Sequence, residues 1–187
     1  MQKIYLVIIT LLACLLGCSS PQSGADLAPD QQNFFDIEGY FNEEIDRLED
    51  LKPTIEKIVS LDGTSETIRP DSLNYENELS VFVNSDINKI SWMDRYAADT
   101  LRNADRALQS VRYEAQDDKL RTRLIEIDYR DGRPDKINIL NRTENALLEA
   151  RQELSYEPNR GFSIQQRQQI RFMKPNEAGI TVTFQNE

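Results

Sequence analysis

The first part of the chain body places apolar residues at the spacing of an α-helix. Within residues 34–51, Ile37, Phe41, Ile45 and Leu48 recur at steps of three and four, and acidic residues fill the positions between them. This spacing predicts an amphipathic helix with one buried face. We expect Pro53 to end it, because proline lacks the backbone N–H that a helix interior needs.

The next 30 residues predict a hairpin followed by a second helix. Residues 54–69 alternate apolar and polar side chains around Asp62-Gly63, a dipeptide suited to the two-residue turn that joins antiparallel strands. From residue 72 to residue 83, Leu73, Leu79 and Phe82 return to helical spacing. Asp71 precedes this segment, so we expect its side chain to cap the second helix.

After about residue 108 the apolar residues recur at every second position. Turn residues at 117–118, 131–132, 159–161 and 175–177 divide this half into short segments, as in an antiparallel meander. Residues 143–156 are the exception, because their composition suits a helix as well as a strand, and we leave both open. The side chains expected to face the helices include Ile125, Ile127, Ile137, Ile139, Val182 and Phe184.

Together these patterns predict an α+β fold, in which N-terminal amphipathic helices pack on a curved antiparallel β-meander. Residues 34–187 have the length of a single domain. The segment from 85 to 96 holds the only tryptophan, Trp92, and joins the helices to the sheet. We expect Trp92 to plug the helix–sheet junction; the alternative is that it lines a ligand cavity.

The N-terminal residues have the pattern of an export signal. Lys3 precedes an apolar run of 13 residues, Ile4–Leu16, which is shorter than the roughly 20 residues that a membrane-spanning helix needs. The end of this run, Leu15-Leu16-Gly17-Cys18, resembles the lipobox of bacterial lipoproteins. The resemblance implies a signal peptide at 1–17 and a lipid on Cys18, which anchors the mature chain. The alternative is an ordinary secretory signal, cut near Gly17, that leaves Cys18 as a free thiol.

The residues after Cys18 predict a flexible tether and a cellular location. Residues 18–33 are rich in Ser, Pro, Gln and Asp, which is typical of a flexible linker. Ser19, rather than Asp, follows the cysteine, and by resemblance to lipoproteins of Gram-negative bacteria this implies the outer membrane. We therefore expect a cell-envelope protein, facing either the periplasm or the cell surface. Cys14 lies in the segment to be removed, so no disulfide is expected.

Charge and composition exclude several classes of function. The formal net charge is −10, which argues against nucleic-acid binding because that depends on basic surfaces. The acids are concentrated in residues 18–100, with 18 acids against 6 bases, whereas residues 101–187 have 14 acids and 15 bases. The chain has no histidine, so Ser-His and Cys-His catalytic pairs and His-ligated zinc sites cannot form.

We therefore expect a protein that is not an enzyme and that needs no cofactor or metal. Asp128, Asp131 and Asp135 surround a predicted turn, but their spacing is not that of a calcium-binding loop. A pair of carboxylates for glycoside cleavage stays open as an alternative, because 32 acidic residues always offer some pair.

Arginine and glutamine residues of the second half form the candidate binding surface. Arg167 and Arg171 alternate with Gln165 and Gln169 along one predicted strand, and Arg151 lies on the segment before it. If these segments pair, we expect their charged and amide side chains to stand opposite one another and form charge and amide ladders. A planar guanidinium surface suits carboxylates or sugars. Separately, Ser72 and Thr100 each lie in an Asp-Ser/Thr-Leu triplet that resembles a bacterial O-glycosylation sequon.

Two kinds of function fit these expectations. The first is a lipid-anchored interaction or assembly module with a protein partner in the envelope. The alternative is a periplasmic carrier that holds an apolar ligand in a half-barrel cavity, because the order of helices and meander loosely resembles half-barrel lipoprotein carriers. Residues 36–48 and 85–96 also resemble a group of uncharacterised Gram-negative envelope lipoproteins, which implies no particular activity.

Overall fold

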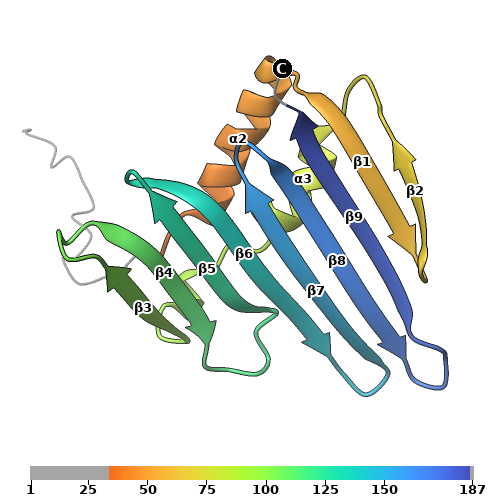
Figure 1. Ribbon diagram of the computed structural model, residues 1–187. Helices are drawn as coiled ribbons and strands as arrows, with labels where there is room; N and C mark the ends of the chain where they lie inside the picture. The colour runs from red at the N-terminus through yellow and green to blue at the C-terminus, as the bar shows by residue number, and fades with distance from the viewer. Residues whose placement is uncertain (1–33, 186–187) are drawn as a thin grey trace, which may run out of the picture. The chain divides into compact units, whose positions relative to one another are not determined.

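A computed structural model describes residues 34–185, which form one nine-stranded antiparallel sheet with two helices on one of its faces (Figure 1). The signal peptide and tether expected at 1–33, with Cys18, lie outside the described residues. The chain enters through helix α2 (Ile37–Leu51), makes strands β1 (Thr54–Leu61) and β2 (Thr64–Ile68), and continues through helix α3 (Tyr75–Val83) and the 3₁₀ turn η1 (Ile90–Trp92).

The other seven strands run as a continuous meander. They are β3 (Tyr96–Arg102), β4 (Leu108–Ala115), β5 (Thr122–Arg130), β6 (Arg133–Glu144), β7 (Leu148–Glu157), β8 (Gly161–Ile170) and β9 (Asn176–Gln185). The last strand, β9, pairs with β1, so the strand order is β2-β1-β9-β8-β7-β6-β5-β4-β3. The N-terminal hairpin therefore forms one edge of the sheet, and β3 forms the other.

The expected α+β class is wrong, because the described structure is predominantly β. The two helices contain 15 and 9 residues, against nine strands in one sheet. Two features explain the difference. The hairpin at 54–68 joins the main sheet through β9 instead of standing apart. Residues 96–102 form an additional strand whose residues after Tyr96 are exposed, so it lacks the apolar alternation that would have predicted it.

Helix α2 follows from its apolar spacing. Ile37, Phe41, Ile45 and Leu48 are its buried residues, as predicted. The Asp36 carboxylate accepts a hydrogen bond from the Gly39 backbone N–H and caps the first turn. The helix ends at Leu51, followed by Lys52 in the left-handed conformation and then by Pro53.

Helix α3 is shorter than predicted and has a different cap. It begins at Tyr75 and buries Tyr75, Leu79 and Phe82. Asn74 is the N-cap, because its side chain accepts a hydrogen bond from the Asn77 N–H at 2.9 Å. The prediction that Asp71 caps this helix is therefore wrong, since an amide nearer to the first turn takes that role.

Two turn predictions are confirmed, and the open segment is resolved. Asp62-Gly63 and Asp131-Gly132 join their strands with positive φ at both residues, the geometry of a tight hairpin. Residues 143–156 are strand rather than helix: β6 ends at Glu144, and β7 pairs with both β6 and β8. Asn145 stabilises the turn between β6 and β7, because its side chain accepts hydrogen bonds from two following backbone N–H groups.

Candidate functional site

The interior between helices and sheet is one candidate, and it is filled. Rings from both layers meet there in tilted and edge-to-face contacts, with centroids 4.7 Å apart between Phe41 and Phe82 and 5.0 Å apart between Phe41 and Tyr156. All three residues have no exposed surface. A carrier cavity would need this space to be empty, and the rings occupy it.

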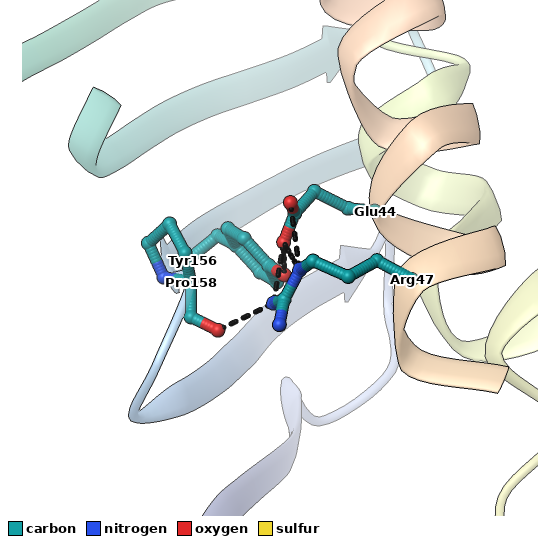
Figure 2. A network of polar contacts seen from close by, with 4 residues as sticks. All are labelled: Glu44, Arg47, Tyr156 and Pro158. Atoms are coloured by element: carbon teal, nitrogen blue, oxygen red, sulfur yellow. Dashed lines mark hydrogen bonds and ion pairs between the residues drawn. The ribbon is translucent and has the colours of Figure 1, made fainter. Parts of the chain in front are cut away.

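A polar network closes the same interior at the side of α2 (Figure 2). The hydroxyl of Tyr156 on β7 donates a hydrogen bond to the Glu44 carboxylate on α2. Arg47, one turn further along α2, donates to Glu44 at 2.7 Å and to the backbone carbonyl of Pro158 at 2.6 Å. Each charged group therefore has a charged or polar partner, as partly buried ionic groups require.

The electrostatics of this network favour a structural role. Burial raises the pKa of Tyr156, and the nearby Glu44 charge raises it further, so the phenol stays protonated and donates its hydrogen bond. The hydrogen bond to Glu44 raises the pKa of Arg47, so its guanidinium stays charged. The network joins α2 to β7 and to the turn after it. We assign it to holding the helix on the sheet.

The other face of the sheet is the second candidate, and it is polar. Side chains alternate along β7: Leu154 and Tyr156 point to the helices and are at most 2% exposed. Arg151 and Glu153 point the opposite way, with side chains 55% and 58% exposed. We call this second side the open face, because both described helices pack on the other one.

Three arginines lie in register on the open face. The Cα pairing places Arg142 of β6 opposite Arg151 of β7, and Arg151 opposite Arg167 of β8. The row ends where Arg167 faces Glu177 of β9. We call Arg142, Arg151 and Arg167 the arginine row. The predicted charge and amide ladder forms between β7 and β8, where Glu149 faces Gln169 and Glu153 faces Gln165. At its centre, however, two like charges stand opposite each other, Arg151 and Arg167.

Four carboxylates pair with the three arginines of the row. Arg142 pairs with Glu144 and Glu149 at 2.9 and 3.1 Å, and Arg167 pairs with Glu177 at 3.3 Å. Arg151 bonds to Glu153 through Nε at 2.8 Å. Within residues 34–185, the two terminal nitrogens of Arg151 have no hydrogen-bond partner. The centre of the row therefore presents a guanidinium edge that can still bind a carboxylate.

Two hollows adjoin the row and share Arg151, Glu153 and Gln165 as lining residues. One has a volume of about 330 Å³, with Leu124 and Leu140 among its lining residues. The other, of about 580 Å³, extends toward Arg167 and the turn between β1 and β2. Gly179 lets two side chains at the edge of this hollow pack closely, because a Cβ there would lie only 2.6 Å from the Ser60 hydroxyl and would collide with Gln165. The open face is thus hollowed beside its arginines.

The residues singled out in the sequence do not all meet at this site. Arg151 and Arg167 are neighbours in the row, whereas Arg171 lies in the turn after β8 rather than on the strand face, because β8 ends at Ile170. Trp92 lies in η1, packs against the core and carries Lys89 Nζ 4.1 Å above its ring, so neither hollow includes it.

The two candidate glycosylation residues are exposed but separate in the fold. Ser72 lies between β2 and α3, ahead of the helix start at which it was expected. Thr100 lies on the edge strand β3. Their modification stays a prediction, and so does the lipid on Cys18.

Arg142 is the member of the row that sequence reasoning missed. Its position could have been inferred, because Ile137 and Ile139 point inward and Arg142 then points outward by alternation. Its alignment with Arg151, however, depends on the turn at Asn145, inside the segment that fitted helix and strand equally well.

Comparison with known proteins finds no relatives. No family model, curated protein or solved structure matches the chain. Among the described residues, no helix has both the length and the apolar character required to cross a membrane. No group of three or more potential metal-ligating side chains occurs within residues 34–185.

Proposed function

We propose that this chain is a lipid-anchored envelope protein without enzymatic activity, and that it acts as an interaction or assembly module. Its open face binds a protein partner through the arginine row, and the partner contributes carboxylates. Guanidinium groups suit this role because their planar fork binds a carboxylate through two parallel hydrogen bonds. The net charge of −10 supports a protein partner over a nucleic acid.

The single observation that carries the proposal is the alignment of Arg142, Arg151 and Arg167 across three strands. Like charges directly opposite one another destabilise a sheet. Adjacent carboxylates offset this repulsion, but Arg151 engages its carboxylate only through Nε, which leaves its terminal nitrogens for a partner's carboxylate. A surface that binds carboxylates explains why the row is present.

The filled interior supports this choice over the carrier alternative. A ligand-sized space between helices and sheet would require the rings of Phe41, Phe82 and Tyr156 to move apart, with loss of their contacts. The network of Glu44, Arg47 and Tyr156 would open with them.

The anchor part of the proposal rests on the sequence. Lipid on Cys18 would hold the protein at the outer membrane, and residues 18–33 would let the folded body reach a partner. Replacing Cys18 with Ala should leave an uncleaved or mislocalised precursor, as judged by fractionation and intact mass. Normal processing and membrane fractionation of that variant would contradict the proposal that Cys18 carries a lipid anchor.

Site-specific photocrosslinking tests the binding face. A photoreactive phenylalanine analogue replaces Gln165, which borders both hollows, in the full chain in intact envelopes. A matched control carries it at Glu49, an exposed position of α2. We expect a defined protein adduct from position 165 and none from position 49.

Charge variants then assign the adduct to the arginine row. Replacing Arg142, Arg151 and Arg167 with Gln should lower the yield at position 165 by roughly tenfold or more, since each lost charge-assisted hydrogen bond weakens binding. Arg130→Gln, at an arginine paired with Asp135 outside the row, should leave the yield unchanged. If position 165 gives no adduct and the purified protein releases stoichiometric lipid on organic extraction, the carrier function replaces this proposal.

A further inference from the structure

Two neighbouring turns at one end of the sheet expose a cluster of large apolar side chains. The turn between β8 and β9 contains Phe172 and Met173, which are 93% and 61% exposed. The turn between β6 and β7 contains Leu147, which is 65% exposed. A hydrogen bond of 2.8 Å from the Arg171 backbone N–H to the Leu147 carbonyl joins the two turns. Figure 1 shows both turns at the lower end of the sheet, to which β6 and β8 point.

We call Leu147, Ile170, Phe172 and Met173, together with Arg171 and Lys174, the tip. Its aromatic residue has an unfavourable backbone conformation. Phe172 has φ of +66°, and the Met173 N–H donates to the Ile170 carbonyl at 3.0 Å, which makes Phe172 the third residue of a β-turn. This position with positive φ favours glycine or asparagine, and a bulky side chain there is strained. Because Phe172 is almost fully exposed, its side chain makes little packing contact within the fold that could compensate for the strain.

Other contacts hold the turn in this shape. The Gln169 side-chain amide donates to the carbonyls of Ile170 and Met173, at 3.0 and 2.7 Å. The Arg171 guanidinium lies 4.9 Å from the centre of the Phe172 ring. The exposed ring is thus presented in a defined position.

The charge of the tip is opposite to that of the chain. Residues 145–148 and 170–175 contain Arg171 and Lys174 and no acid, whereas the whole chain has a net charge of −10. Exposed apolar clusters of this kind mark surfaces that contact another phase or molecule. Apolar side chains beside Arg and Lys are typical of segments that enter the boundary between lipid headgroups and acyl chains, where the cations meet anionic headgroups.

We propose that the tip inserts into the surface of an anionic lipid bilayer, with Phe172 and Met173 entering the acyl boundary and Arg171 and Lys174 contacting headgroups. A bilayer suits this shape because a protruding turn needs no complementary pocket to enter it. The inference rests on the tip alone. It requires neither a lipid on Cys18 nor partner binding by the arginine row.

Single-tryptophan quenching tests the insertion on the full chain. In a Trp92→Phe background, a tryptophan replaces Phe172, Met173 or, as the control, Leu51 at the end of α2. Leu51 is 60% exposed. Leu51 lies just before Thr54, which pairs with Gln185 at the end of β9. The tip lies just before the start of β9, so the control and the tip are at opposite ends of this strand. Each protein is added to phosphatidylcholine vesicles with or without phosphatidylglycerol, and with brominated acyl chains as quencher.

We expect a blue shift and strong quenching at positions 172 and 173, and neither at position 51, whether or not the N-terminal region also attaches to the vesicle. Replacing Arg171 and Lys174 with Ser should reduce the preference for phosphatidylglycerol. Absence of quenching at 172 and 173, or equal quenching at all three positions, would overturn insertion. Shielding of 172 by a protein in native envelopes, without quenching by lipid, would assign the tip to a protein contact instead.

A measurement on the unmodified chain covers the case in which a tryptophan variant does not fold. Amide hydrogen exchange with and without anionic vesicles should show added protection in residues 170–175 but not in residues 50–54. Equal exchange of residues 170–175 in both conditions would contradict the insertion independently of any substitution.

Discussion

The two faces of the sheet belong to the same strands and differ in almost every property. On the helix-covered face, Tyr156, Phe82 and Phe41 interlock with no exposed surface. On the open face, Arg151 and Arg167 stand opposite each other and remain more than half exposed. One face thus packs the core, and the other exposes arginines that are aligned across three strands. This difference is the basis for proposing that the open face binds a partner.

High pH should weaken the helix-covered face most. Burial raises the pKa of Tyr96 and Tyr129 to about 12, and it raises the pKa of Tyr40 and Tyr156 as well. The folded state therefore binds these protons more tightly than the unfolded state. Their stabilising contribution is complete below pH 10, the ordinary tyrosine value, and is lost as pH rises from 10 toward 12 and above.

Four tyrosines share this shift, so the loss of stability from each adds to the others as pH rises through this range. We expect tyrosinate absorbance to rise in one step with the loss of far-UV circular dichroism above pH 10. Gradual ionisation of all tyrosines near pH 10, with the fold intact, would show that the face is less closely packed than described.

Truncation in the interior should be the largest single-site effect. Phe82→Ala removes a ring that contacts Phe41, Tyr156 and Phe162, and should lower the free energy of unfolding by about 3–5 kcal/mol. The matched change on the open face, Ile58→Ala at a side chain 37% exposed, should cost about 1 kcal/mol or less. Urea unfolding gives the free energy of unfolding of both variants. Equal decreases in the two would contradict the difference between the faces.

Loss of one hydrogen bond in the buried network should have a smaller effect. Tyr156→Phe keeps the ring and removes the hydroxyl that donates to Glu44, at an expected cost of about 1.5–3 kcal/mol, since the acceptor is charged. Tyr129→Phe, at a partly buried tyrosine outside the network, is the control. A Tyr156→Phe variant as stable as the parent would show that Arg47 alone satisfies Glu44.

The local elements followed from the sequence more closely than their assembly did. The four buried positions of α2 have the strict spacing of an amphipathic helix, and Asp62-Gly63 has turn chemistry that few alternatives share. The edge strand at 96–102 lacked alternation because almost all of it is exposed. Pairing between β1 and β9 joins residues more than 100 positions apart, and no local pattern encodes it.

The candidate site shows the same limit. Alternation along each strand is a local property, so Arg151 and Arg167 could be placed on one face from the sequence. Register is not local, because it depends on how turns align the strands. The sequence therefore did not reveal that arginines stand opposite one another, and Arg142 was missed because its alignment with Arg151 depends on the turn at Asn145.

The most direct test of the difference between the two faces is the stability of a chain that lacks the arginine row. We would measure the free energy of unfolding of the full chain with Arg142, Arg151 and Arg167 replaced together by Gln. We predict a value within about 0.5 kcal/mol of the parent, because exposed ion pairs contribute little, and the lost repulsion among the arginines is offset by the loss of their pairing with four carboxylates. A loss of about 2 kcal/mol or more would contradict this, since the row would then serve the fold rather than a partner.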